Sequence, residues 1–268
     1  KKCFNSAAQS IHIWMYTVTD ILLIHQLEKQ ADLGVDITVH YDKNGGTQTL
    51  PASLHPQIVK SKGLMHRKIV IIDEATVFIG SANMTIPSLL LHDNLTVGIY
   101  NREMASFLLS PVGNTFRFQD GMIWLLPDKK GAVEIERKIN AANSTIFIAM
   151  FTLTHNKLVD ALIRAKQRGV DVKLAIDRYT ARGASKKAVQ RLSQANIEIF
   201  YSSGLPLLHH KWAYIDHKEL ILGSTNWTES AFNKNHDVLL FLEHLPAHFQ
   251  SQIDAIVSAI QMESNREL

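Results

Sequence analysis

Short apolar runs alternate with amphipathic stretches along this chain, and the alternation is typical of an α/β fold. In the N-terminal part it predicts a strand over Ile11–Tyr16, a helix over Ile21–Ala31 and a strand over Val35–Tyr41. Gly34 stands where the helix needs a left-handed residue before the next strand. The same order returns in the C-terminal part over Ile146–Phe151, Lys157–Arg168 and Val170–Ile176, with Gly169 at the corresponding position.

Other runs are apolar without interruption and predict strands buried on both faces. They are Ile69–Ile72 and Val77–Ile79 in the first part, and Trp212–Ile215 and Leu220–Leu222 in the second. The segment Met122–Leu126, which precedes a helix expected over Val133–Ala142, indicates a further core strand that opens the second part.

The two parts are copies of one unit. Residues 11–43 align without a gap on residues 146–178 at an offset of 135, and 11 of the 33 positions are identical. Residues 64–85 align on residues 207–228 at an offset of 143, with 9 of 22 identical. We therefore predict an α/β fold of two pseudo-twofold-related repeats, each a mixed sheet flanked by helices, with one shared site. The repeats are assigned to residues 1–115 and 121–268, with the polar stretch Ser110–Asp120 as the boundary.

Composition narrows the class of protein without naming a partner. The 268 residues are 46% hydrophobic, which suffices for a packed core, and the formal net charge of +3 is only mildly basic. A single cysteine, Cys3, excludes an internal disulfide and a multi-cysteine zinc site. No apolar run is long enough to span a bilayer, so we expect a soluble or peripheral protein and leave its compartment open.

Each copy carries the same polar pattern, His-x-Lys, four residues, Asp, and then Gly-Ser-x-Asn. The residues are His66, Lys68, Asp73, Ser81 and Asn83 in the first copy, and His209, Lys211, Asp216, Ser224 and Asn226 in the second. Side chains two apart on a strand point to the same face, so each histidine shares a pocket with its lysine. A twofold relation would bring the two pockets together around one phosphate.

This arrangement fits phosphodiester chemistry. One neutral imidazole can attack phosphorus while the opposite imidazolium donates a proton to the leaving oxygen and then activates water. The lysines and the amides of Asn83 and Asn226 would donate to the phosphate oxygens. Ser81 and Ser224 are included among the phosphate-binding candidates and could orient the site by hydrogen bonds, with the equal alternative that Gly-Ser only forms the turn. No metal or other cofactor is needed.

The duplicated pattern resembles the signature of the phospholipase D superfamily, also called HKD proteins. The resemblance covers nearly the whole chain. It indicates a compact two-repeat type that is similar to small bacterial HKD nucleases and mitochondrial cardiolipin hydrolases. It implies a phosphohistidine intermediate, independence from metal, and substrates that range from phospholipids and cardiolipin to nucleic acid.

The supporting residues are less symmetric than the motif. Asn94 and Asp237 each lie 28 residues beyond the catalytic histidine of their own copy, and the resemblance implies a carboxylate that orients a histidine ring. We expect Asn94 beside His66 and Asp237 beside His209, which favours His66 as nucleophile and His209 as acid. Asp73 and Asp216 are expected to hold the turns after their strands.

The function we favour is phospholipase D-type hydrolysis of phospholipid, because the chain is only mildly basic. A nuclease acting on single- or double-stranded nucleic acid and a phosphatidyl transferase are the alternatives, and two intact motifs argue against a protein that only binds. Peripheral membrane contact is compatible with either lipid reaction. We expect a monomer, because one chain holds both half-sites.

At the repeat offset, the strand Ile123–Leu126 and most of the helix Val133–Ala142 have no counterpart after Lys1, so we expect the natural chain to extend upstream.

Overall fold

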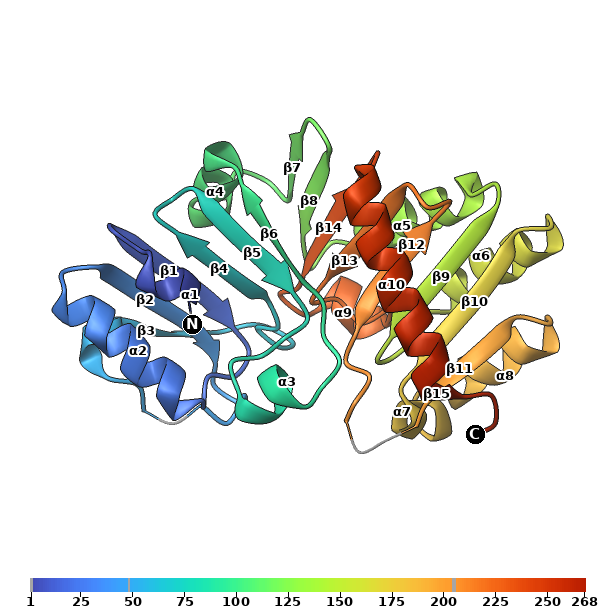
Figure 1. Ribbon diagram of the computed structural model, residues 1–268, viewed down its shortest axis with the longest axis horizontal. Coiled ribbons are helices and arrows are strands. Elements are labelled where there is room, and N and C mark those ends of the chain that lie inside the picture. Colours follow the sequence, from blue (N-terminus) through green and yellow to red (C-terminus); the bar gives the residue numbers. More distant parts are fainter. Residues whose placement is uncertain (1, 48, 204–205) are drawn as a thin grey trace.

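The computed structural model describes residues 2–47, 49–203 and 206–268, which form two mixed β-sheets flanked by helices (Figure 1). The first sheet has the order β3-β2-β1-β4-β5-β6. Strands β1, β2 and β3 are parallel, and β4, β5 and β6 run antiparallel to their neighbours. Their bounds are β1 Ser10–Met15, β2 Asp36–Asp42, β3 Pro56–Val59, β4 Lys68–Ile72, β5 Thr76–Gly80 and β6 Thr96–Tyr100.

The second sheet has the order β15-β11-β10-β9-β12-β13-β14-β8-β7. Its strands from β11 to β14 repeat the order and direction of the whole first sheet. The bounds are β7 Thr115–Phe118, β8 Gly121–Leu125, β9 Thr145–Met150, β10 Asp171–Ile176, β11 Glu198–Ser202, β12 Lys211–Ile215, β13 Glu219–Gly223, β14 Val238–Leu242 and β15 Ser264–Asn265. The duplicated α/β architecture expected from the sequence is confirmed.

The stretch expected to be a polar boundary contains a strand. Residues 115–118 form β7, whose Phe116 pairs with Ile123 of β8. Strand β8 then pairs with β14, so the second sheet extends to residue 115. Alternation of Phe116 and Phe118 with Thr115 and Arg117 gives this short strand one apolar face.

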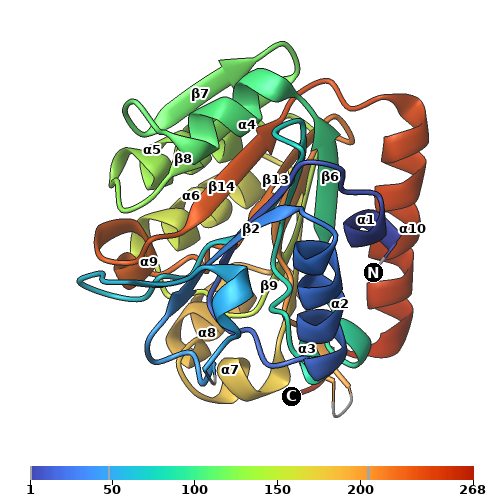
Figure 2. The ribbon, with the colours of Figure 1, turned by 90° about the vertical axis from the view of Figure 1, so that its left-hand side faces the viewer.

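The helices lie along both sheets (Figures 1 and 2). Helix α2 begins where Asp20 accepts hydrogen bonds from the backbone N–H groups of Leu22 and Leu23. It ends before Gly34, whose φ of +91° is matched by +93° at Gly169 after α6. The bounds are α1 Lys2–Asn5, α2 Ile21–Asp32, η1 Ala52–Leu54, α3 Ile86–Leu90, α4 Arg102–Leu109, α5 Lys130–Ala141, α6 Asn156–Gln167, α7 Arg178–Arg182, α8 Lys186–Gln194, α9 Glu229–Asn233 and α10 Ala247–Glu263.

Three apolar cores hold these layers together. One lies between the first sheet and α2, a second between the second sheet and helices α5, α6 and α8, and the third is shared by both sheets. In the shared core, Ile69 and Ile79 of the first sheet belong to the same cluster as Trp212 and Leu222 of the second. Because burial of apolar surface drives such packing, the two repeats form one unit with their facing strand ends at the seam.

The two repeats differ at one edge. Strand β14 pairs with β8, whereas the equivalent strand β6 is the outermost strand on its side among the described residues. At the repeat offset, α1 matches the last turn of α5. The expected upstream counterparts of β8 and α5 stay a prediction. None of the helices in the described parts of the chain combines the length and hydropathy that crossing a membrane requires.

Candidate active site

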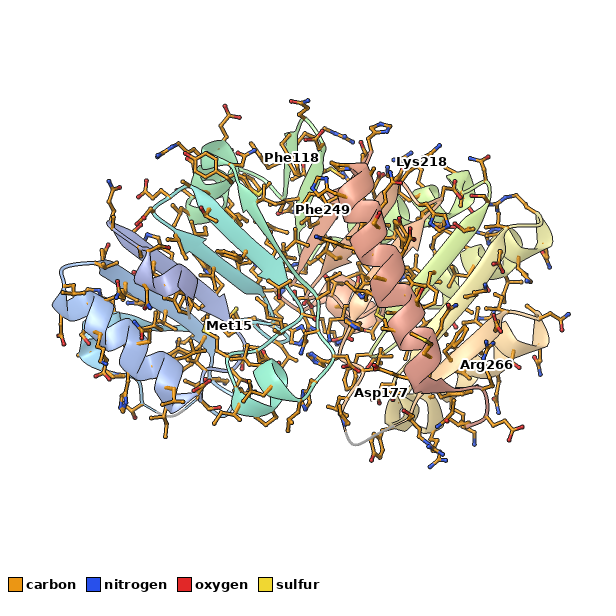
Figure 3. All side chains as sticks on the ribbon, viewed as in Figure 1. Met15, Phe118, Asp177, Lys218, Phe249 and Arg266 are labelled. Atoms are coloured by element: carbon orange, nitrogen blue, oxygen red, sulfur yellow. The ribbon has the colours of Figure 1, made fainter. Side chains whose placement is uncertain are left out.

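The two His-x-Lys pairs stand at equivalent strand ends near the seam. His66 lies two residues before Lys68, the first residue of β4, and His209 lies two residues before Lys211, the first residue of β12. Lys68 pairs with Met15 at the end of β1, and Lys211 pairs with Met150 at the end of β9. In Figure 3, Met15 and Asp177, which follows β10, mark strand ends on either side of the middle of the molecule.

Each histidine is anchored by the opposite repeat through its backbone. The N–H of His66 donates to the carbonyl of His236 at 2.8 Å, and the N–H of His209 donates to the carbonyl of Asp93 at 2.9 Å. These bonds join the segment before β4 to the segment before β14, and the segment before β12 to the segment before β6. The two histidines of the candidate site are therefore positioned by docking of the repeats.

The ring partners are crossed between the repeats, so the expected pairing within each repeat is wrong. His66 Nδ1 lies 2.8 Å from Asp237 Oδ1, and His209 Nδ1 lies 3.0 Å from Asn94 Oδ1. The 28-residue spacing located both partners but assigned each to the wrong ring. The physical reason is the exchange of backbone contacts at the seam, which brings Asp237 to His66 and Asn94 to His209.

The hydroxyls of Ser81 and Ser224 support these partners. Ser224 Oγ donates to Asp237 Oδ1 at 2.6 Å and accepts the N–H of Val238. Ser81 Oγ donates to Asn94 Oδ1 at 2.8 Å and accepts the N–H of Leu95. Both hydroxyls are buried and engaged behind the rings, as expected of serines that orient the site by hydrogen bonds, and phosphate binding by them stays a prediction.

These contacts set the tautomer of both rings. The carboxylate of Asp237 can only accept, so Nδ1 of His66 carries the proton. The Nδ2 of Asn94 donates to the carbonyl of Ser88 at 2.8 Å, which turns its Oδ1 toward His209. Nδ1 of His209 therefore also carries a proton. In the neutral state each ring keeps a lone pair on Nε2.

The two lysines are buried beside the rings in equivalent ways. Lys68 Nζ donates to the carbonyl of His66 at 2.8 Å, and Lys211 Nζ donates to the carbonyl of His209 at 2.9 Å. Lys68 lies over the ring of Tyr16 and Lys211 over that of Phe151, at 5.5 and 5.1 Å from the ring centres. Burial lowers the pKa of Lys68 to about 7, and burial together with Lys68 lowers the pKa of Lys211 well below its usual range.

Burial also favours the neutral histidines. It lowers the pKa of His66, Lys68 adds to the effect, and Asp237 partly offsets it. It lowers the pKa of His209 more strongly, with Lys211, Lys68 and His66 acting in the same direction. Since the charges of both repeats act on each ring, the two pockets form one electrostatic site. Burial alone would raise the pKa of Asp237, but His66 and Ser224 hold it below its ordinary value.

The asparagines of Gly-Ser-x-Asn remain candidates for phosphate binding. Asn83 and Asn226 are half-buried, and the Oδ1 of each has no hydrogen-bond partner within the described residues. The backbone N–H of Asn83 donates to Ser88 Oγ at 2.8 Å, which fixes the turn. A buried amide oxygen without a hydrogen-bond partner is energetically costly. When the amide group is turned so that Nδ2 faces the site, this nitrogen can donate a hydrogen bond to a phosphate oxygen.

The carboxylates of Asp73 and Asp216 lie at the turns after β4 and β12. Asp73 accepts the backbone N–H groups of residues 8–10, and Asp216 accepts those of residues 143–145. These bonds outweigh the effect of burial and lower the pKa of both carboxyls, that of Asp216 to about 2. Each carboxylate thus ties its turn to the segment that enters the neighbouring strand.

Three aromatic neighbours of the site were not singled out from the sequence. Tyr16 lies edge-on to His66 with ring centres 5.5 Å apart, and Phe151 lies 5.0 Å from His209. They occupy equivalent positions at the repeat offset of 135, so the alignment carried a signal for both. His92, whose ring centre is 6.1 Å from that of His209, has Asn235 at its equivalent position and no such signal.

The chain is similar to curated proteins over part of its length. It is 34% identical over 108 residues to the mitochondrial cardiolipin hydrolase of Mus musculus, which covers 40% of this chain and 48% of that protein. It is 30% identical over 109 residues to a phospholipase D of Rickettsia prowazekii, covering 41% and 53%. The chain spans about half the length of the curated relatives it matches.

Solved structures resemble one or both repeats. Nuc, a phospholipase D family member from Salmonella typhimurium, matches with a TM-score of 0.51 and 25% identity over 53% of this chain and 94% of that chain. A phosphatidylserine synthase from Haemophilus influenzae matches with a TM-score of 0.76 over 98% of this chain and 83% of that chain, and its 11% identity supports the fold alone. The family described as "Cardiolipin synthase, PLD-like domain" matches residues 1–110 and 135–260. Since that match includes both repeats, the chain belongs to the PLD-like domain family of the phospholipase D superfamily.

Proposed function

We propose that this chain is a phosphodiesterase that hydrolyses phospholipids in the manner of phospholipase D, through a phosphohistidine intermediate. The observation that carries the proposal is the pair of buried histidines whose Nδ1 atoms both bond to acceptors of the opposite repeat. Each Nε2 is left for chemistry, with a lysine beside each ring. Two such imidazoles can act as nucleophile and general acid on one phosphodiester.

His66 is the proposed nucleophile. Attack by its Nε2 leaves a positive charge on the ring, and the carboxylate of Asp237 at Nδ1 compensates that charge. His209 has only the neutral amide of Asn94 at Nδ1, so its protonated form is the stronger acid and gives its proton up more readily. The crossed pairing thus favours the same roles for His66 and His209 as the sequence did. The reason differs, because the carboxylate of Asp237 lies beside the proposed nucleophile and not beside the proposed acid.

The proposed reaction has two steps. Before the first step His209 takes up a proton from solvent at Nε2, which the bound anionic diester favours because it raises the pKa of the ring. In that step a bond forms between Nε2 of His66 and phosphorus, the bond to the leaving oxygen breaks, and that oxygen takes this proton from Nε2 of His209. In the second, water attacks phosphorus, His209 takes a proton from the water, and the bond between phosphorus and His66 breaks. The products are a phosphomonoester and the freed alcohol.

Lys68 and Lys211 are proposed to bind the phosphate, together with the amides of Asn83 and Asn226. Burial makes both lysines reluctant to carry charge in the empty site. An anionic phosphodiester reverses that balance, because it raises the pKa of each ammonium. Charge-assisted donors then lie where negative charge builds up in the transition state, a contribution typically of a few kcal/mol per donor.

A phospholipid substrate is favoured by the relatives. The mouse protein is named a mitochondrial cardiolipin hydrolase and the Rickettsia protein a phospholipase D. We carry over to this chain only the substrate class, a phosphodiester of a lipid. We also propose that residues 1–115 and 121–268 act as the two half-site units and that a monomer is active, because the catalytic contacts all lie within one chain.

A parallel assay of one purified preparation tests this proposal. Vesicle phospholipid, single-stranded DNA and lipid with added primary alcohol report hydrolysis of lipid, nuclease activity and phosphatidyl transfer, respectively. We expect release of phosphatidic acid or its cardiolipin-derived equivalent, with DNA left intact. Cleavage of DNA without turnover of lipid would replace the proposed substrate with nucleic acid. The variants His66→Ala and His209→Ala serve as controls, because loss of the activity in both shows that the turnover takes place at this site.

A further inference from the structure

An apolar groove lies on the first repeat between the start of α2 and helix α3. It encloses about 500 Å³ and is lined by residues that include Leu22, Met84, Ile86, Leu89 and Leu90. Three of the lining side chains and two of their chain neighbours are largely exposed, and we call these five the rim. The lining residues are Leu22 61%, Ile86 50% and Leu90 75%, and the neighbours are Ile21 62% and Leu91 59%.

The second repeat has polar residues at the same positions. At the repeat offsets of 135 and 143, the five rim residues Ile21, Leu22, Ile86, Leu90 and Leu91 correspond to Asn156, Lys157, Glu229, Asn233 and Lys234. Two equivalent surfaces with the same backbone therefore differ in chemistry. The second repeat carries three formal charges there, whereas the first carries none.

A covering helix does not account for this difference. In the second repeat, α5 lines the equivalent groove, which encloses about 250 Å³. Phe232 of α9, the counterpart of Leu89, is buried in the same core as residues of α5. Glu229 and Lys234 remain exposed beside α5. A helix placed on the first repeat in the same way would cover Leu89 and leave Ile86 and Leu91 facing outward. Exposed apolar side chains at such positions indicate another apolar surface.

This apolar rim is joined directly to the catalytic site. Ser88 of α3 accepts the N–H of Asn83 through its hydroxyl and the Nδ2 of Asn94 through its carbonyl. Directly after Leu91 comes His92, whose ring lies 6.1 Å from that of His209. The outer side of α3 is thus apolar while its inner side holds residues of the phosphate site.

We propose that the rim formed by Ile21, Leu22, Ile86, Leu90 and Leu91 is the surface by which this enzyme docks on a phospholipid bilayer. The protein presents an apolar surface for the acyl chains and a site with two lysines for the phosphate of a phospholipid. Uncharged apolar side chains meet the acyl region, and Lys68 and Lys211, buried in the candidate active site, meet the anionic phosphate. The inference rests on the proposed phospholipid substrate and adds the side from which the lipid is approached.

The test replaces leucines of the rim by the amide that the second repeat has at position 233. The double variant Leu90→Asn/Leu91→Asn adds no charge, and it changes the last residue of α3 and its C-cap, both of which are exposed. The matched control is Leu33→Asn/Val112→Asn, which alters residues 78% and 89% exposed at the end of α2 and in the loop before β7. Flotation with vesicles of phosphatidylcholine containing cardiolipin measures binding, and bis(p-nitrophenyl) phosphate measures turnover of a soluble diester.

We expect the rim variant to bind vesicles at least roughly tenfold more weakly and to lose vesicle hydrolysis in proportion, because each leucine contributes apolar burial. Its turnover of the soluble diester should equal that of the wild type, and the control should match the wild type in every assay. Wild-type binding by the rim variant, or an equal loss in the control, overturns the inference while lipid hydrolysis stands. If the wild type is a dimer and the rim variant is a monomer with unaltered vesicle binding, the rim serves self-association and the inference is overturned. If the wild type cleaves only DNA, the proposed function fails and the flotation result alone decides the surface.

Discussion

Replacing Lys68 by methionine should stabilise the fold while abolishing catalysis. The ammonium of Lys68 is buried, and its hydrogen bond runs to the carbonyl of His66. Burial lowers its pKa from 10.5 to about 7. Methionine has a similar length and no charge to bury, so the variant removes an unfavourable group from the empty site.

The magnitude follows from proton linkage. Between pH 7 and pH 10.5 the unfolded chain keeps a proton on Lys68 that the folded chain releases, so the free energy of unfolding rises with pH through this window. The shift corresponds to roughly 4 kcal/mol of lost stability at pH 7, at about 1.4 kcal/mol per unit. Loss of the hydrogen bond to His66 subtracts about 1 kcal/mol from the gain in the variant. We expect a net stabilisation of roughly 3 kcal/mol at pH 7, which shrinks by about 2 kcal/mol at pH 9.

Urea denaturation at both pH values measures this difference, and turnover of phosphodiester confirms the loss of activity. Lys138→Met is the matched control, because Lys138 is also buried but lies 2.7 Å from Glu219 and 2.6 Å from Glu243. Removing that ammonium leaves two carboxylates without their cation and should destabilise the protein by roughly 1–3 kcal/mol. If Lys68→Met proves less stable than the wild type by the same amount at pH 7 and pH 9, Lys68 is charged and stabilising in the empty site, and the reasoning is refuted.

Other predictions concern the chemical steps. Replacing His66 or His209 by alanine should lower turnover of a phosphodiester by several orders of magnitude, and EDTA should leave the wild-type rate unchanged; inhibition that a divalent ion reverses would contradict the metal-free reaction. Acid quenching during turnover should trap phosphate on His66, as peptide mapping can verify, and recovery on His209 would reverse the assignment. Asn94→Asp should raise the pKa of His209 and shift the alkaline limb of kcat/KM to higher pH, because the general acid keeps its proton longer; an unchanged profile would argue that His209 is not that acid.

Much of the fold could be predicted because local pattern and repetition agree. The buried strands before Asp73 and Asp216 are continuous apolar runs, and the left-handed glycines after α2 and α6 fall where the helices end. Strand β7 was missed because its two phenylalanines stand in a polar stretch of only four paired residues. Periodicity over so few positions does not distinguish a strand from a loop.

The structure brings the predicted site residues together, but through connections that the sequence did not predict. The spacing of 28 residues identifies Asn94 and Asp237, and it says nothing about which ring each will meet. That choice depends on long-range contacts, since Met65 pairs with His236 and Asp93 with Leu208 across the seam. Such contacts form only when the shared core is assembled, so no pattern within either repeat could reveal them.

The crossed pairing has a consequence for how the two histidines can differ. Each ring takes its backbone anchor and its Nδ1 acceptor from the other repeat, so neither repeat alone holds a histidine in the reactive tautomer. A site built from two identical units would give both rings the same acceptor and hence the same basicity. In a single duplicated chain the acceptors are free to diverge, and here one is the carboxylate of Asp237 and the other the amide of Asn94. Because a carboxylate stabilises a charged ring more than an amide does, this one difference is the basis on which we propose His66 as nucleophile and His209 as acid within an otherwise symmetric frame.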